Sequence, residues 1–282
     1  RFESASRRLI DAGLRGDGVA STLVEVLDHP RLDRMVELAP TIRSSETPVR
    51  DTLKVARQAV DGGRDAVVES ALQRLLDQGA TGDGLAAGIV AVADHPRLDE
   101  IVATVPHVLE SRTPTMRAVD AARVVVDSGH RDRVVGTLDA LRANGIAGDR
   151  LDITLAELAD DPSYDQVTSL MVPVARIDPN VIAAVKTARR AVEAGRGDRL
   201  ASATTALAGQ FTRNGSGLPD QLLTIIDDPA FDDIVELMPR IGELGTRSAD
   251  VITVTRSVLD SGNPERVLAI ARTVAGGGTP GP

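Results

Sequence analysis

The chain has 282 residues and is 42% apolar, which is enough to bury a core but long for a single one. Its net charge of -9 argues against a phosphate-binding surface, because such a surface needs clustered Lys and Arg. The absence of Cys excludes disulfides and thiolate chemistry, and no apolar run approaches the roughly 18 residues of a membrane span. We therefore expect no membrane contact. The compartment stays open, with the cytoplasm as the default.

A sequence pattern recurs along the chain at a spacing of 66 residues. Asp28-His29-Pro30 opens the pattern and Asp94-His95-Pro96 opens it again. Asp-Asp-Pro takes the same place at 160–162 and, 67 residues later, at 227–229, where the extra residue is expected in the polar loop 213–217. A shorter period of 33 lies inside, because 64–96 and 97–129 share an apolar profile. Recurrence of this kind is typical of stacked supersecondary units.

The first half of each unit predicts two helices. One is expected over about Asp65 to Gln78, where apolar residues recur every three or four positions. Gly79 stands where a left-handed residue would end that helix. Asp83 is expected to be the N-cap of the second helix. The counterparts of these two residues elsewhere are Gly13, Gly145, Asp17 and Asp149.

The second half predicts two more helices. Pro96 is expected to start the third, where a missing N–H costs nothing. Thr113-Pro114 is expected to cap the fourth, and Gly129 to close it. The counterparts are Thr47-Pro48, Asp178-Pro179, Gly63, Gly195 and Gly262. Because proline removes a backbone hydrogen bond, a bend in the third helix is expected at Pro40, Pro106, Pro173 and Pro239.

The predicted fold class is all-α, since no stretch alternates as a half-buried strand would. We expect about seventeen helices in tandem hairpins of about 33 residues, forming an elongated α-solenoid. A single repeat domain should cover 1–275, followed by a flexible linker or tail at 276–282. The hairpins are expected at 1–30, 31–63, 64–96, 97–129, 130–162, 163–195, 196–229 and 230–262, with a terminal helix at 263–275.

The pattern does not match a common repeat family in detail. The stretch from Ser128 to Leu138 resembles the middle of an ankyrin repeat, but the helix before it is too long and the TPLH motif is missing. Tetratricopeptide repeats need Trp, Tyr and Phe at set positions, whereas this chain has no Trp and one Tyr. The general architecture is similar to HEAT-like α-solenoids without a diagnostic motif, so we assign no family.

Two sets of recurring polar residues are candidates for function. His29 and His95 occupy equivalent turns, where Asp161 and Asp228 stand later. A row of Asp/His corners could bind divalent metal, but such turns lie too far apart to supply three converging ligands, so helix capping is favoured.

The second set is arginine. These residues recur in the fourth helix, each followed four positions later by an acid. They could grip the carboxylates of a partner peptide or form a structural ladder with neighbouring acids, and the structural ladder is favoured. The binding candidates are Arg57, Arg123, Arg189 and Arg256.

Catalysis has little support from the motifs. The chain has only four His and no HExxH, P-loop or GxSxG pattern, and His107 and His130 have no evident partner in sequence. We expect a non-enzymatic scaffold for protein–protein interaction within a larger protein, with a protein or peptide partner, no metal and no cofactor. The alternative is a structural spacer, or a self-associating subunit of a filament or particle. An enzyme or a nucleic-acid-binding solenoid is less favoured.

Overall fold

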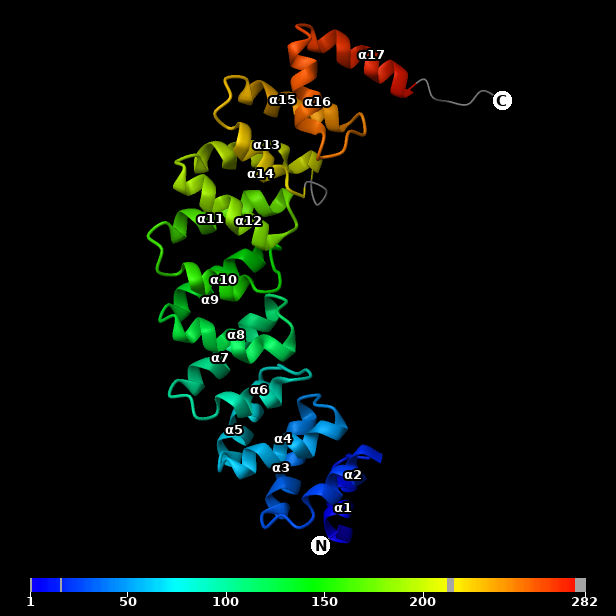
Figure 1. The fold of residues 1–282 in the computed structure, drawn as a ribbon, viewed down its shortest axis with the longest axis vertical. Helices are drawn as coiled ribbons and strands as arrows, with labels where there is room; N and C mark the ends of the chain where they lie inside the picture. Colours follow the sequence, from blue (N-terminus) through cyan, green and yellow to red (C-terminus); the bar gives the residue numbers. More distant parts are fainter. Residues whose placement is uncertain (1, 16, 212–215, 277–282) are drawn as a thin grey trace, which may run out of the picture. The chain divides into compact units, whose positions relative to one another are not determined.

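The computed structural model describes residues 2–15, 17–211 and 216–276. Within these ranges the chain forms seventeen α-helices and no strand (Figure 1), which confirms the all-α prediction. Residues 213–215 of the predicted polar loop and the predicted tail from 277 onward lie outside the described residues. None of the described helices is long and apolar enough to cross a membrane.

Backbone contacts divide the chain into two units, which we describe separately. The first comprises Arg1–Ala143 with Ala147–Ala159, and the second Asn144–Ile146 with Asp160–Pro282. The single domain predicted over 1–275 stays a prediction. The helices of the first unit are α1 (Phe2–Asp11), α2 (Asp17–Val26), α3 (Leu32–Ser44), α4 (Val49–Asp61), α5 (Asp65–Asp77), α6 (Leu85–Val92), α7 (Leu98–Glu110), α8 (Thr115–Asp127), α9 (Arg131–Ala143) and α10 (Leu151–Leu158).

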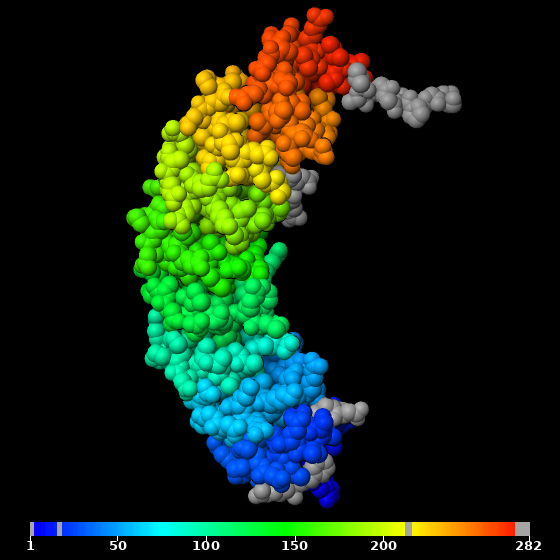
Figure 2. All heavy atoms as spheres, viewed as in Figure 1, coloured from blue at the N-terminus to red at the C-terminus, as the bar shows by residue number. Residues whose placement is uncertain are grey.

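The first unit is built in two layers of helices. The odd-numbered helices α1 to α9 pack each against the next odd one, and the even-numbered α2 to α10 do the same. Each odd helix also packs against the even helix that follows it, and the space-filling view shows these blue to green helices in close contact (Figure 2). The core between the layers is aliphatic, as the composition requires, with fully buried Leu9, Leu53, Leu72 and Ile101 among its members.

The second unit repeats most of this packing scheme. Its helices α11, α13 and α15 contact one another in order, and α12, α14 and α16 lie against them. The core is mainly aliphatic, but it also buries Tyr164, Phe211 and Phe231. The helices are α11 (Tyr164–Ile177), α12 (Val181–Glu193), α13 (Gly197–Phe211), α14 (Leu218–Ile225), α15 (Phe231–Gly242), α16 (Val251–Asp260) and α17 (Pro264–Gly276).

The glycines expected after helix ends adopt the left-handed conformation. Gly79 follows α5 with φ of 74°, and Gly129 follows α8 with φ of 77°. Their amides donate to carbonyls three residues back, Leu76 and Val126, which ties off the last helical turn. The same conformation is found at Gly13, Gly145, Gly63, Gly195 and Gly262, so this part of the prediction is confirmed.

The predictions for helix starts are wrong in several places. The N-cap of α6 is the left-handed Gly84, not Asp83, and that of α10 is the left-handed Arg150, not Asp149. Pro96 lies in the turn before α7, which begins at Leu98. At α6 and α10 a left-handed residue directly precedes the helix, and the aspartate one position earlier makes no capping hydrogen bond.

The fourth helices also start differently from the prediction. The residues preceding α4 and α8 are Pro48 and Pro114, and neither Thr47 nor Thr113 forms a side-chain cap. In α12 the cap is Asn180, whose side chain accepts a hydrogen bond from the amide of Ala183. Asp17 is already the first residue of α2.

The four recurring prolines lie inside continuous helices. Pro40, Pro106, Pro173 and Pro239 fall within α3, α7, α11 and α15, and none of these helices is split. The bend expected at each proline stays a prediction.

Candidate functional site

The arginines singled out in the first unit are engaged with acids. Arg57 on α4 places Nε 3.3 Å from Asp61 Oδ2, and Arg123 on α8 places a guanidinium nitrogen 3.2 Å from Asp127 Oδ2. Arg123 also lies 2.7 Å from Asp120. These pairs span one helical turn, where opposite charges stabilise a helix by a few tenths of a kcal/mol, roughly 0.2–0.5.

The arginines in the second unit reach a different element. Arg189 on α12 contacts Glu193 at 2.8 Å and also Asp161, in the turn before α11, at 3.5 Å. Arg256 on α16 pairs with Asp228, in the turn before α15. All four arginines keep 39–48% of the side chain exposed, so they remain accessible from solvent.

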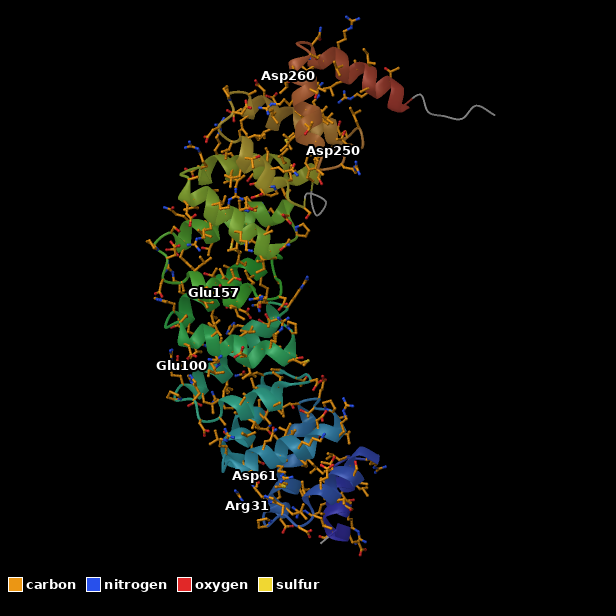
Figure 3. All side chains as sticks on the ribbon, viewed as in Figure 1. Arg31, Asp61, Glu100, Glu157, Asp250 and Asp260 are labelled. Carbon is orange, nitrogen blue, oxygen red and sulfur yellow. The ribbon has the colours of Figure 1, made fainter. Side chains whose placement is uncertain are left out.

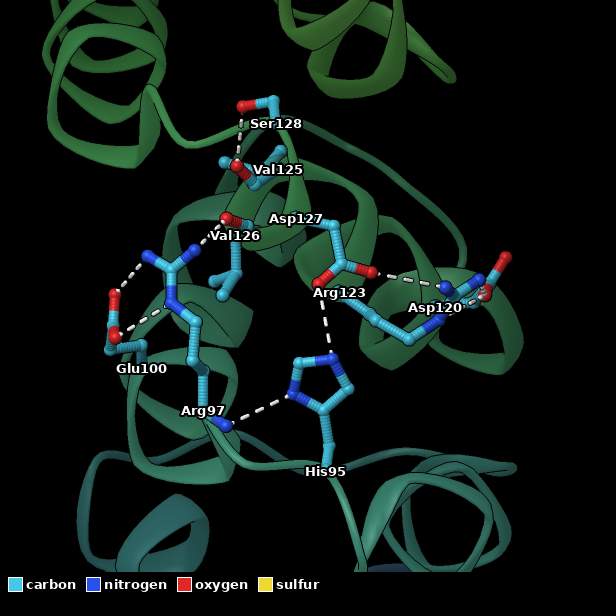
Figure 4. A network of polar contacts seen from close by, with 9 residues as sticks. All are labelled: His95, Arg97, Glu100, Asp120, Arg123, Val125, Val126, Asp127 and Ser128. Carbon is cyan, nitrogen blue, oxygen red and sulfur yellow. Dashed lines mark hydrogen bonds and ion pairs between the residues drawn. The ribbon is translucent and has the colours of Figure 1, made fainter.

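His95 holds the turn between α6 and α7 (Figure 4). Its Nδ1 accepts a hydrogen bond from the Arg97 amide at 3.1 Å, which places the ring proton on Nε2. That nitrogen lies 3.0 Å from Asp127 Oδ1, whose other oxygen bonds Arg123. His29 makes the matching contacts, to the Arg31 amide at 3.1 Å and to Asp61 Oδ1 at 2.7 Å.

Aspartates take over this task in the second unit. Asp161 Oδ1 accepts from the Ser163 amide at 2.8 Å, and Asp228 Oδ1 accepts from the Ala230 amide at 2.9 Å. The hydrogen bonds from the Ser163 hydroxyl and amide lower the pKa of Asp161. In all four turns, the side chain at this position therefore accepts a hydrogen bond from the backbone amide two residues later. Its second contact is an acid where the residue is His and an arginine where it is Asp.

Three potential metal ligands converge in the first unit, away from these turns. His107 and Glu110 on α7 and Asp139 on α9 place one ligand atom each within 4.8 Å of one another. His107 Nδ1 lies 3.2 Å from Asp139 Oδ1. Arg142 bonds Glu110 and lies 3.4 Å from the same Asp139 oxygen, so it already compensates both carboxylates. In the described part of the chain no other group of three meets this criterion.

Several arginines bridge a carbonyl at the end of another helix and an acid. Arg97 donates to the Val126 carbonyl in the last turn of α8 and to Glu100 on α7. A guanidinium can serve both because its donors form a planar fork, which an ammonium lacks. Arg31, which lies near Asp61 in Figure 3, is the counterpart of Arg97. Among the described residues, carbonyl contacts of this kind join Arg31 to Val60, Arg64 to Val90, Arg133 to Ala159 and Arg199 to Ile226.

Two buried aspartates have opposite environments. Asp65 accepts from Arg34 Nε at 2.6 Å and from Arg31 at 3.0 Å, and the bond from Arg34 holds its pKa below the usual value. Asp152 is fully buried, and its contacts are the Thr113 hydroxyl at 2.8 Å and the Ile153 amide at 2.7 Å. Burial therefore raises the pKa of Asp152.

Sequence reasoning located the recurring arginines and histidines but missed two features. The carbonyl contacts of Arg31 and Arg97 could have been suspected, since these residues are themselves 66 apart. The contact between Thr113 and Asp152 joins the turn before α8 to the first turn of α10, and no spacing rule predicts it. Comparison with known protein families, with curated proteins and with solved structures finds no match.

Proposed function

We propose that the chain is a tandem array of helical hairpins, a HEAT-like α-solenoid in general architecture, that serves as a non-enzymatic scaffold binding a protein partner. The array is supported by contacts that recur at the same spacing. His29 and His95 make the same pair of bonds, and Arg31 and Arg97 reach carbonyls at equivalent helix ends. Contacts between neighbouring hairpins are the stabilising interactions of repeat proteins.

The observation that carries the non-enzymatic part is the use made of the histidines. His29 and His95 hold turns, and His107 is paired with Asp139 beside Arg142. These three histidines are therefore already engaged in contacts that hold turns and helices together. The negative net charge also disfavours nucleic acid as the partner.

The four exposed arginines are the proposed contacts for carboxylates of the partner. They recur on the fourth helix of each successive 66- or 67-residue unit and are only partly buried: Arg57, Arg123, Arg189 and Arg256. A partner's carboxylate would compete with an exposed intramolecular pair, which is itself worth only about 0–1 kcal/mol.

Affinity capture with the tagged chain tests this proposal. The scaffold should bind one partner with the chain as a monomer in light scattering, and replacing the four arginines by Gln should weaken binding without changing the circular dichroism. The matched control replaces four other exposed arginines, Arg7, Arg50, Arg247 and Arg272, and so changes the charge equally. Self-association without a partner would favour the spacer or assembly subunit instead.

A further inference from the structure

The second unit has an open groove between α11 and α13. Its volume is about 560 Å³. Leu170 and Val192 supply apolar wall, and the polar lining comes from Asp165, Gln166, Ser169 and Asp198. The charged residues that line the groove are both acids, and Asp165 also has an interaction partner within the chain.

The equivalent place in the first unit is filled by an arginine of the chain itself. Arg131, 66 residues before Gly197, is the first residue of α9, as Gly197 is of α13. Its Nε donates to Thr104 Oγ1 at 2.8 Å, and its guanidinium lies 2.7 Å from Asp132. Only 23% of the Arg131 side chain is exposed, so most of it is covered where it packs against α7.

The register of this comparison is fixed by the structure. Gly129 and Gly195 are both left-handed, at φ of 77° and 68°, and each lies two residues before the position compared. Two residues after it, Arg133 and Arg199 both donate to a carbonyl that follows a short helix. The acid of the filled site is kept, because Asp132 corresponds to Asp198.

In an earlier repeat the position equivalent to Gly197 carries a charge that pairs with an opposite charge on the neighbouring helix. Asp65 is the earlier counterpart of Arg131 and pairs with Arg34, whose later counterpart is Glu100. In the second unit Gln166 and Gly197 take the two places. Both members of the opposed pair are therefore lost, while Asp198 remains and the space stays open.

We propose that this groove binds an arginine side chain of the partner protein. The inference rests on the proposed function, because it names the chemistry of the partner's contact. The guanidinium meets Asp198, as that of Arg131 meets Asp132 in the first unit, while its methylene stem lies on Leu170 and Val192. Lysine fits less well because its point charge cannot bond two acceptors in a fixed fork.

The probe is a capped Gly-Arg-Gly tripeptide, and its binding is measured from the amide chemical shifts of the full chain. We expect saturable shifts at Gly195, Gly197 and Asp198, with weaker binding of the lysine tripeptide. The citrulline tripeptide, a neutral isostere of arginine, should not bind. Asp198→Asn should weaken the arginine tripeptide by about tenfold, since a hydrogen bond to a charged group is lost.

Filling the groove from within is the sharper test. A Cβ on Gly197 meets only Val192 at 3.6 Å and Leu170 at 3.8 Å, so Gly197→Arg fits the fold and places an arginine where the first unit has one. This variant should abolish tripeptide binding. The matched control is Gly136→Arg, which adds the same charge at an open, exposed position of α9 and should leave binding unchanged.

The outcomes separate this inference from the proposed function. Equal binding of the citrulline peptide, shifts confined to other residues, or undiminished binding by Gly197→Arg would each overturn the groove. A partner captured equally by the wild type and by Gly197→Arg would keep the scaffold and reject the groove. Arginine binding lost in Gly197→Arg, in a chain that captures no partner, would keep the groove and reject the scaffold.

Discussion

Replacing the buried Asp152 by Asn should leave the protein as stable as before or make it more stable at neutral pH. Asp152 lies in the first turn of α10 with no exposed surface, and its carboxylate accepts from the Thr113 hydroxyl and the Ile153 amide. An asparagine keeps both contacts: its oxygen accepts from the Ile153 amide, and its NH₂ donates to the Thr113 oxygen. Removing the buried charge should add up to about 1 kcal/mol to the unfolding free energy.

Alanine at the same position separates the charge from the hydrogen bonds. Asp152→Ala leaves the Thr113 hydroxyl and the Ile153 amide without their acceptor in a buried place. Each of the two unsatisfied groups costs about 1–3 kcal/mol, so the unfolding free energy of the alanine variant should be about 2–6 kcal/mol lower than that of the asparagine variant.

The pH dependence follows from the raised pKa of Asp152. The folded protein binds this proton more tightly than the unfolded chain does, so wild-type stability falls as the pH rises from the ordinary Asp pKa through the raised one. The asparagine variant lacks this loss. Its advantage over the wild type should therefore grow across that window and stay constant above it.

Urea unfolding followed by far-ultraviolet circular dichroism, across a pH series, measures both effects. Asp149→Asn is the matched control, because Asp149 lies three residues earlier, is partly exposed and pairs with Arg117 at 2.6 Å. Its effect should stay below about 1 kcal/mol. If Asp152→Asn is as damaging as Asp152→Ala at every pH, the burial argument is wrong.

Three further predictions concern contacts described above. Asp65→Asn should destabilise by about 2–3 kcal/mol at neutral pH through the weakened bonds from Arg34 and Arg31. Because the folded pKa of Asp65 is lowered, that loss should shrink as the pH falls through it in acid unfolding curves, and a constant loss would contradict the charge argument. His95→Asp should lower the unfolding free energy by less than about 1 kcal/mol, because Arg123 can bridge two acids as Arg189 does. A double-mutant cycle should show about 1 kcal/mol of coupling between His95→Asp and Arg123→Ala, and no coupling would mean that the bridge fails to form. Gly88→Ala should lower the melting temperature, since its Cβ would lie 2.8 Å from Val119 Cβ. Gly136→Ala places its Cβ in open space within α9 and should add about 0.5–1 kcal/mol to the unfolding free energy. Equal effects of the two substitutions would refute the packing argument.

Helix positions could be predicted because they depend on local signals. The helix expected over about Asp65 to Gln78 is found at Asp65–Asp77, and Gly79 ends it as expected. Helix starts were harder. Asp83 carries a favoured capping side chain, but the left-handed Gly84 precedes the helix. A Cβ at Gly84 would lie 2.8 Å from Met116 Cα, a contact between distant residues that local signals do not reveal.

The candidate site was predictable only in its recurring members. A period in the sequence marks Arg123 and His95 as equivalent to other residues, but the chain does not reveal which acid each contacts. Arg256 bonds Asp228 in the turn before α15, although Asp260 lies four residues on, because rotamer and helix packing decide between two nearby partners. The open groove was not predictable at all, since it is defined by the side chain that Gly197 lacks.

The short helix α10 has a consequence for dividing the molecule. Three residues of earlier helices and loops depend on it or on the segment beside it: Thr113 bonds Asp152, Arg117 bonds Asp149, and Arg133 bonds the carbonyl of Ala159. An N-terminal fragment that stops after α9 would remove the acceptors of these three hydrogen bonds. A fragment carried through Ala159 retains them, so the place to sever the first unit for separate expression is after that residue.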